Sequence, residues 1–365
     1  MNSILFVTGA LSDGGAEKVL SVLASQMAII GVETELVVLR DKIIVYPLAE
    51  EVKLYQLHEE GKKFVALRRI FALRKILRQS KANVVIPFLP IITLYTMIAN
   101  IGVGKRIVAS ERGDPRANLF GSNFSSKDKI GNLFIRKWKL LGCADWVVFQ
   151  TPDAQSYYGE RIERKSSIIP NPLDTSRLPG RFEGEREKRI IAAGRFSEEK
   201  NFPMLLRTFA AFHKEFPEYK LELCGEGALR GELEAMCIQL GIVDAVEMPG
   251  FVSNLADRMH NAAMYISTSN HEGISNSMLE ALGMGVPTIV TDCPVGGARM
   301  FIKNGENGII IPMEDEDALL DGMQSIVCDR VFAENLSINA VKIREDLAAE
   351  KVCQQWLKII HPYFK

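Results

Sequence analysis

The segment from Ser267 to Pro287, STSNHEGISNSMLEALGMGVP, constrains the fold more than any other part of this sequence. It follows an apolar run, Ala262 to Ile266, which is typical of a short buried strand. Gly273 permits a sharp turn, and Ser275 or Asn276 can cap the helix that follows. The segment therefore predicts a strand, a turn and a helix, and the unpaired amide groups at such a helix start favour an anion such as a phosphate.

Two carboxylates flank this turn. Glu272 comes just before the helix, and Glu280 lies in its second turn. We therefore expect Glu272 to lie beside whatever binds at the turn, and Glu280 to accept hydrogen bonds from vicinal hydroxyls such as those of a ribose. The spacing alone would also fit two solvated glutamates, because carboxylates are abundant on protein surfaces.

A glycine-rich turn follows the first predicted strand. Ser3 to Thr8 is apolar and has no basic segment before it, so it indicates a buried strand rather than a signal peptide. Gly14 and Gly15 would let the backbone approach a ligand closely at the start of the next helix. Tight packing of the turn would explain the same two glycines.

Further apolar runs at regular spacing predict strands that alternate with helices, which is typical of βαβ units and parallel sheets. The chain has 365 residues, of which 47% are hydrophobic, enough for two doubly wound α/β domains with separate cores. The prolines of the segment from Ile168 to Asp174 stiffen a boundary between them. The remaining predicted strands are Glu35 to Leu39, Val84 to Phe88, Arg106 to Ser110, Asp145 to Gln150, Arg189 to Ala193, Leu221 to Cys224, Val246 to Met248, Thr288 to Thr291 and Ile309 to Ile311.

Neither a metal site nor a membrane span is expected. The six cysteines show no paired spacing, and the acids of Asp315-Glu-Asp317 precede a helix that they can cap, although Asp-x-Asp also binds metals in other proteins. The uncharged run from Val84 to Ile101 is long enough to raise the question of a transmembrane helix. Pro87 and Pro90 divide it, so we expect a strand followed by a short helix.

The segment from Gly61 to Ala82 contains eight basic residues and no acid. Its apolar residues recur at helical spacing and can line one side of a helix. This pattern fits a helix packed on the sheet with a solvated basic face, or a face that touches an anionic membrane. The apolar residues are Phe64, Leu67, Ile70, Phe71, Leu73, Ile76 and Leu77, and the basic ones are Lys62, Lys63, Arg68, Arg69, Arg74, Lys75, Arg78 and Lys81.

The charge is distributed unequally between the two halves of the chain. Residues 1 to 174 contain 24 basic and 17 acidic residues, a net charge of +7, whereas the rest contains 20 and 28, a net charge of −8. A basic N-terminal half suits a domain that works at an anionic membrane surface, so we favour that interpretation of the basic helix.

Charged residues follow two of the predicted strands, at the sheet edges where ligands bind in open α/β folds. Arg195 and Lys200 come after the strand that ends at Ala193, a placement suited to holding a diphosphate. A basic pair on a loop is otherwise usually solvated. The loop after the strand Arg106 to Ser110 carries Glu111, Arg112 and Asp114, of which the last two could simply pair.

Six strings of this sequence, in this order, resemble those of the family 4 retaining glycosyltransferases, which have the GT-B fold. The resemblance covers nearly the whole chain and is closest to bacterial enzymes that extend oligosaccharides on undecaprenyl diphosphate, including N-acetylgalactosamine transferases. The family often has a histidine in the loop where this sequence has Arg112. The strings are Gly14-Gly-Ala-Glu17, Asn171-Pro-Leu-Asp174, Gly194-Arg-Phe196, Glu199-Lys-Asn201, Gly225-Glu-Gly227 and the Glu272 to Glu280 segment.

The resemblance implies an acceptor domain over residues 1–170, a nucleotide-sugar domain over 171–348, and a helix over 349–365 that crosses back. It implies retaining, metal-independent transfer of a hexose or N-acetylhexosamine from a nucleotide diphosphate sugar, with UDP expected, to a lipid-linked glycan. It implies no cofactor and a peripheral cytoplasmic location on the inner membrane face. The catalytic residues would be Glu272, Arg195 and Lys200, the acceptor or sugar side would include Glu111, Arg112 and Asp114, and the donor would bind Gly14, Gly15, Gly194, Arg195, Lys200, Gly225, Glu226, Phe251, Gly273, Ile274, Ser275, Asn276 and Glu280.

Other classes of protein share this architecture. A nucleotide-sugar epimerase would need more acid and base side chains in its cleft, and a glycogen-type phosphorylase would need a cofactor lysine that the sequence does not reveal. A non-catalytic protein that binds sugar nucleotides would carry the same donor motifs. Release of a nucleotide diphosphate on turnover distinguishes a transferase from such a binding protein.

Overall fold

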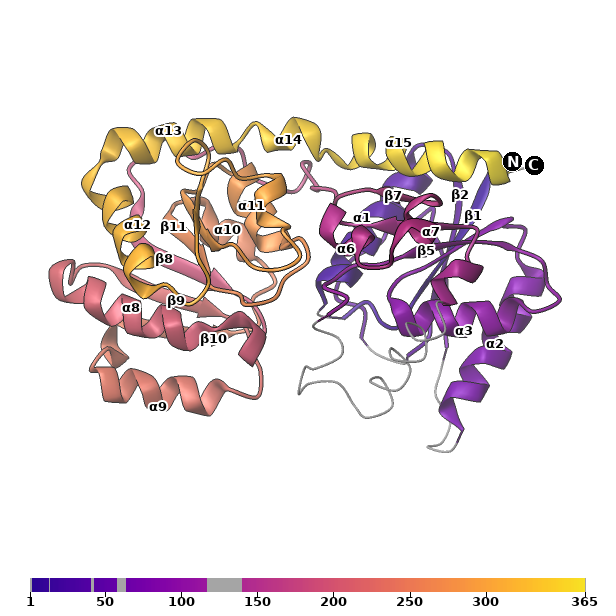
Figure 1. Ribbon diagram of the computed structural model, residues 1–365, viewed down its shortest axis with the longest axis horizontal. Coiled ribbons are helices and arrows are strands. Elements are labelled where there is room, and N and C mark those ends of the chain that lie inside the picture. Colours follow the sequence, from indigo (N-terminus) through magenta and orange to yellow (C-terminus); the bar gives the residue numbers. More distant parts are fainter. Residues whose placement is uncertain (1, 13, 41–42, 58–63, 117–139, 365) are drawn as a thin grey trace. The chain divides into compact units, whose positions relative to one another are not determined.

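The computed structural model describes residues 2–12, 14–40, 43–57, 64–116 and 140–364. The chain forms two compact units (Figure 1). Unit 1 comprises Met1–Pro172 together with Leu347–Lys365, and unit 2 comprises Leu173–Asp346.

Unit 1 is built on a seven-stranded sheet of order β3-β2-β1-β4-β5-β6-β7 in which every pair of neighbours is parallel. The order reverses between β1 and β4, so this is a doubly wound fold, as predicted. The strands are β1 (Ser3–Thr8), β2 (Glu33–Val38), β3 (Lys53–Gln56), β4 (Val84–Pro87), β5 (Arg106–Ser110), β6 (Trp146–Phe149) and β7 (Ser166–Ile168).

Helices cover both faces of the unit 1 sheet. One face packs against α1 (Gly15–Ile29) and α15 (Ala349–Ile360), which contact each other although they come from opposite ends of the chain (Figure 1). The other face packs against α2 (Val65–Gln79) and α3 (Pro90–Asn100). Two short helices follow β6, α6 (Pro152–Ser156) and α7 (Glu160–Glu163). In the described part of the chain, no helix combines the length and the hydropathy that a bilayer span requires.

Helix α2 corrects one expectation from the sequence, that its apolar residues share a single packed face. Leu73, Ile76 and Leu77 are buried against the sheet and α3. Ile70 is partly buried and packs against the same cluster. Leu67, Phe71 and the N-cap residue Phe64 are 52%, 67% and 74% exposed and form a second stripe at i, i+3, i+7 of the sequence.

The basic residues of α2 also differ from one another in their surroundings. Arg74 donates from Nη1 to the carbonyl oxygens of Ala99 (3.1 Å) and Ile101, so it caps the end of α3. Arg68, Lys75 and Arg78 are exposed. Lys62 and Lys63 lie outside the described residues.

Unit 2 has a six-stranded sheet of order β10-β9-β8-β11-β12-β13, again with parallel neighbours throughout. Its order reverses between β8 and β11. The strands are β8 (Glu187–Ala193), β9 (Lys220–Cys224), β10 (Val246–Gly250), β11 (Ala262–Ser267), β12 (Thr288–Thr291) and β13 (Ile309–Ile311), and the helices are α8 (Phe202–Glu215), α9 (Arg230–Leu240), α10 (Leu255–His260), α11 (Asn276–Gly283), α12 (Glu316–Cys328), α13 (Arg330–Ala340) and α14 (Ile343–Asp346).

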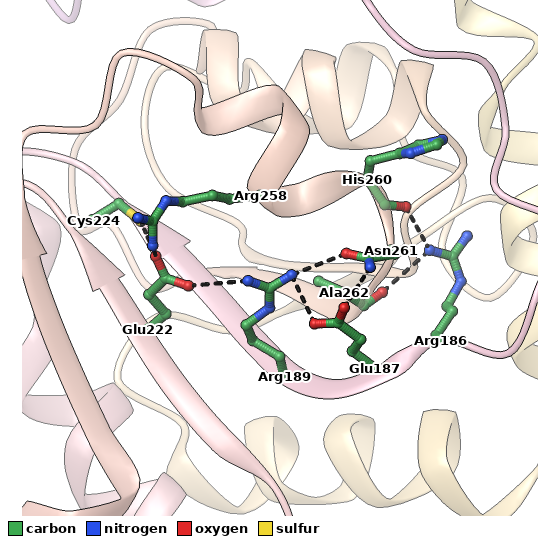
Figure 2. A network of polar contacts seen from close by, with 9 residues as sticks. All are labelled: Arg186, Glu187, Arg189, Glu222, Cys224, Arg258, His260, Asn261 and Ala262. Atoms are coloured by element: carbon green, nitrogen blue, oxygen red, sulfur yellow. Dashed lines mark hydrogen bonds and ion pairs between the residues drawn. The ribbon is translucent and has the colours of Figure 1, made fainter.

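A network of charged side chains ties the strands of unit 2 to α10 (Figure 2). Glu222 of β9 is 2% exposed and accepts hydrogen bonds from Arg189 of β8 (3.5 Å) and from Arg258 of α10. Arg189 also bonds the side chain of Asn261, which precedes β11 (2.9 Å). Because Glu222 has a cationic partner on either side, its burial is compensated by charge-assisted hydrogen bonds. The same carboxylate and burial raise the pKa of the neighbouring Cys224 thiol to about 12, with burial as the larger cause.

Candidate functional site

The loops that follow β8 and β11 lie side by side at the carboxyl edge of the unit 2 sheet. These two strands are neighbours at the point where the strand order reverses, and open α/β sheets bind ligands at such switch points. The loop after β8 carries Arg195 and Lys200, and the loop after β11 carries Glu272. The fold therefore brings these three predicted residues to one edge of one sheet.

The ammonium group of Lys200 forms an ion pair with Oε2 of Glu272. Ser269 donates to the same carboxylate oxygen at 3.5 Å. Burial lowers the pKa of Lys200, but the Glu272 carboxylate raises it, and the net result lies above the usual lysine value. Lys200 is therefore a fixed positive charge at the site over the physiological pH range. Arg195 is exposed just beyond the end of β8.

Three loops are joined to one another around Glu272. Its backbone N–H donates to the Pro294 carbonyl at 2.9 Å, and its own carbonyl accepts from Val295 at 3.0 Å, so the loop after β12 holds the Glu272 backbone on both sides. The Thr268 hydroxyl donates to the Lys200 carbonyl at 3.0 Å, which joins the loop after β11 to the loop after β8. Thr268 and the loop after β12 were not predicted as part of the site. The run of serine and threonine after β11 is nevertheless a signal for such loop contacts.

Two glycines permit close approach of backbone segments in this region. A Cβ atom on Gly297 would lie 1.9 Å from the carbonyl oxygen of Gly273, and one on Gly225 would lie 1.9 Å from that of Gly194. Real contacts at such a distance do not occur, so both positions require glycine. The turn of Gly225 is thus packed backbone to backbone on that of Gly194, and the turn of Gly297 on that of Gly273.

Helix α11 begins at the site, as the sequence predicted. Ser275 is its N-cap residue and accepts a hydrogen bond from the Met278 N–H at 3.3 Å, and Asn276 is the first helical residue. Glu280 is buried within this helix, and Ile274 is buried in the turn before it. The hydroxyl of Tyr265, a residue within β11, is 2.7 Å from the Ser277 hydroxyl and fixes the first turn of the helix to the sheet.

Two further predicted residues lie on the loops after β9 and β10. Glu226 pairs with Arg230 at 2.5 Å, and a Cβ on Gly250 would lie 3.0 Å from the Glu226 carboxylate. The ring of Phe251 is 51% exposed, which leaves an aromatic face open to solvent. Since an exposed aromatic face can stack on a planar group, this ring is a candidate contact for a nucleobase.

In unit 1, the Gly14 and Gly15 turn already holds an anionic group from the chain itself. Oε2 of Glu17 accepts from the N–H groups of Ser12 (2.7 Å) and Gly14 (3.2 Å). A Cβ on Gly14 would meet the Glu17 carboxylate carbon at 3.2 Å. A capping carboxylate of the chain thus occupies these two amide groups, and contact of Gly14 and Gly15 with the donor stays a prediction.

The loop after β5 is buried, and its arginine is enclosed. The Arg112 guanidinium carbon lies 5.1 and 5.4 Å from the ring centroids of Phe88 and Trp356, which stack on each other, and the guanidinium bonds Asn171 Oδ1 at 3.2 Å. It also bonds the Ser110 hydroxyl at 2.8 Å. Burial lowers the pKa of Arg112 to about 9. Its environment is that of a buried structural cation beside two aromatic rings.

The acids on either side of Arg112 have other partners. Asp114 accepts a hydrogen bond from the Arg116 N–H at 2.8 Å, so it caps its own loop, and Glu111 accepts from the Tyr158 hydroxyl at 3.5 Å. Both side chains are buried. The alternative that Arg112 and Asp114 pair with each other is not the arrangement that these contacts describe.

The acids of the Asp315-Glu-Asp317 string lie at the start of α12. Asp315 is the N-cap residue and accepts from the Ala318 N–H at 2.9 Å, as expected from the sequence. Among the described residues, no three His, Cys, Asp or Glu side chains are grouped so that they could hold a metal ion.

Comparisons with known proteins relate unit 2 to one family. Residues 179–343 match the family model described as "Glycosyl transferases group 1". Unit 2 is a group 1 glycosyltransferase domain. The protein is thus a glycosyltransferase, and the doubly wound sheets of its two units are those of the GT-B fold.

The glycosyltransferase is similar over its full length to curated bacterial proteins. It is 28% identical over 375 residues to a Campylobacter jejuni alpha-1,4-N-acetyl-D-galactosaminyltransferase named for the acceptor GalNAc-alpha-(1->4)-GalNAc-alpha-(1->3)-diNAcBac-PP-undecaprenol, with 99% of this chain and 98% of that protein covered. It is 21% identical to the amylovoran biosynthesis glycosyltransferase AmsD of Erwinia amylovora, with 98% and 99% covered.

Solved structures share the fold of this glycosyltransferase. The sucrose-phosphate synthase of Thermosynechococcus elongatus superposes with a TM-score of 0.85 at 17% identity, covering 100% of this chain and 99% of that one. Anabaena HepE in complex with UDP and glucose gives a TM-score of 0.82 at 17% identity, covering 99% and 100%. At these identities the likeness concerns the fold alone.

Proposed function

We propose that this glycosyltransferase moves a hexose or N-acetylhexosamine from a UDP-sugar to a hydroxyl group of a lipid-linked bacterial glycan, with retention of anomeric configuration. The observation that carries the proposal is the cluster of Arg195, Lys200 and the N-terminus of α11 at the switch point of unit 2. Two cations and a helix start at one sheet edge suit a diphosphate. The similarity to a transferase named for an undecaprenol-linked acceptor supports the choice of acceptor.

In the proposed reaction the protein stabilises the leaving group. The bond between the sugar C1 and the β-phosphate oxygen breaks while the acceptor oxygen bonds to C1 on the same face. Negative charge grows on the departing diphosphate, and Arg195 and Lys200 stabilise it by charge-assisted hydrogen bonds. The acceptor proton passes to the leaving phosphate oxygen, so no metal and no separate protein base is required.

The two glutamates take different parts in this proposal. Glu280 lies inside α11 and is buried, which suits a fixed acceptor for the ribose hydroxyls. Glu272 lies outside the helix beside Lys200, so it faces the sugar side of the diphosphate. Phe251, with its exposed ring, stacks on the base.

Unit 1 supplies the acceptor side in this proposal, and α2 holds it at the inner face of the cytoplasmic membrane. The exposed stripe of Phe64, Leu67 and Phe71 can enter the interfacial region of a bilayer. The exposed basic residues of the same helix, Arg68, Lys75 and Arg78, attract anionic headgroups. The combination is typical of a peripheral helix that lies in the membrane plane.

Turnover tests the proposed function directly. The purified protein is incubated with each of a panel of UDP-, GDP- and ADP-sugars together with a lipid extract that contains undecaprenyl-diphosphate-linked oligosaccharides. We expect release of UDP that depends on the extract, with a matching gain of one sugar on the lipid-linked glycan by mass spectrometry. Binding of UDP-sugars without release in any extract would indicate a non-catalytic binding protein, and a changed sugar on the donor would indicate an epimerase.

A further inference from the structure

The ion pair of Lys200 with Glu272 occupies the position that the proposed function gives to a donor phosphate. The ammonium group has a carboxylate oxygen as its partner, and a phosphate oxygen would make the same charge-assisted hydrogen bond. The two side chains remain 19% and 25% exposed. A ligand entering from solvent can therefore reach both groups without unfolding the site.

The Glu272 side chain can leave Lys200 without moving its loop. Its backbone is fixed at both N–H and C=O by Pro294 and Val295, at 2.9 and 3.0 Å. The side-chain contacts that the structure gives for Glu272, from Lys200 and from Ser269, both involve the single oxygen Oε2. Rotation about the side-chain bonds breaks these contacts and leaves the loop in place.

The surroundings of Lys200 favour exchange of one anion for another over loss of an anion. The Lys200 side chain lies against Gly194, where a Cβ atom would come within 3.0 Å of its Cε atom, so its stem is confined. A partly buried ammonium group without an anionic partner is costly. When the carboxylate leaves, another anion has to take its place.

We propose that Glu272 holds Lys200 as a stand-in for the diphosphate in the ligand-free protein, and that the donor displaces it. This inference rests on the proposed function and deepens it. The arriving β-phosphate takes the Lys200 ammonium group, and the released Glu272 carboxylate turns toward the sugar. One exchange thus couples occupancy of the phosphate position to placement of Glu272 beside the sugar.

The exchange has a consequence that a passive sugar contact would not have. Every diphosphate must first break the internal ion pair, so Glu272 lowers the affinity of the site for UDP. Glu272→Gln removes the competing charge and keeps the size of the side chain. We expect UDP to bind Glu272→Gln about tenfold more tightly than wild type, which corresponds to about 1.4 kcal/mol. Transfer should fall in the same variant because the sugar contact is lost.

Calorimetric titration of the full-length protein with UDP and with uridine tests the exchange. Uridine lacks the phosphates, so its affinity should be the same in wild type and Glu272→Gln. Glu198→Gln is the matched control, because it removes one exposed negative charge from the loop that carries Lys200. In this control the UDP affinity should stay within about twofold of wild type. In a Lys200→Gln background, Glu272→Gln should also change UDP affinity by no more than about twofold.

The possible outcomes distinguish failure of this inference from failure of the proposed function. If wild type binds no nucleotide diphosphate of any base, the proposed function fails. If wild type binds UDP and Glu272→Gln binds it equally or more weakly, the stand-in role is overturned while the transferase remains. Equal tightening of UDP and uridine would also overturn it, because the effect would then not arise at the phosphates. Should Glu272→Gln fail to fold, Glu272→Asp, whose shorter side chain withdraws the carboxylate from Lys200, must tighten UDP binding for the inference to stand.

Discussion

Gly297 offers a test of how closely the loops around Glu272 depend on backbone packing. A Cβ atom at this position would lie 1.9 Å from the Gly273 carbonyl oxygen and 3.2 Å from the Ile274 Cα. Ordinary contact needs about 3.4 Å, so Gly297→Ala must push the Gly273 turn away by more than 1 Å. Overpacking of this kind costs about 1–3 kcal/mol of folding stability. A shift of about 1 Å near reacting groups lowers the turnover rate about 100-fold.

The assays are urea unfolding and UDP release under saturating donor, each compared with Gly231→Ala. Gly231 lies in α9 with no atom within 4 Å of an added Cβ. That control should gain up to about 1 kcal/mol of stability from helix propensity and keep wild-type turnover. Wild-type turnover and stability in Gly297→Ala would refute the argument, because the loops would then have room that the structure denies them.

Three further predictions concern the buried glutamates and α2. Glu280→Gln should weaken UDP binding about tenfold by calorimetry, because the ribose hydroxyls lose a charged acceptor. Binding of 2′,3′-dideoxy-UDP, which lacks these hydroxyls, should stay unchanged, and equal weakening of both ligands would contradict that role. Glu222→Gln should lower the free energy of unfolding in urea by only about 1–3 kcal/mol, because its two arginine partners stay partly solvated. Turnover under saturating donor should persist. Unchanged stability would show that the network contributes nothing. Replacing Arg68, Lys75 and Arg78 with glutamine should reduce sedimentation with anionic vesicles about 150-fold, at about 1 kcal/mol per charge, and higher salt should reduce the wild-type binding. Equal binding of wild type to neutral and anionic vesicles would contradict the electrostatic attraction. The control variant replaces three exposed basic residues of unit 2, Lys214, Lys303 and Arg330, with glutamine.

The sequence predicted the fold where strands are buried on both faces. Runs such as Ser3–Thr8 and Thr288–Thr291 coincide with β1 and β12 because a parallel strand covered by helices is apolar throughout. Two strands of unit 1 were missed, β3 and β7, which lie at the edges of its sheet. Edge strands are partly exposed, and neither sequence, KLYQ or SSI, carries an apolar run.

The residues of the candidate site could be predicted from the sequence, but the contacts between them could not. Arg195, Lys200 and Glu272 follow predicted strands, so their place at a sheet edge follows from the fold. The pairing of Lys200 with Glu272 depends on β8 and β11 being neighbours, which the sequence does not state. Periodicity likewise cannot say which apolar stripe of α2 packs on the sheet, so the exposure of Phe71 had to come from the structure. Whether the predicted residues bind the donor stays a prediction.

The packing of α15 has a consequence for how the chain folds during synthesis. Unit 2 is continuous, whereas unit 1 takes Trp356 and Ile360 of α15 into its core, with Trp356 stacked on Phe88 at 6.4 Å. At about 5–20 residues per second, the ribosome reaches residue 360 about 10–40 s after it has completed residue 172. The first unit in the sequence is therefore the last to complete its core. Until then, the apolar surface that α15 covers on α1 and Phe88 is exposed. If translation stalls before α15 is made, the nascent unit 1 therefore keeps this apolar surface open for chaperones to recognise.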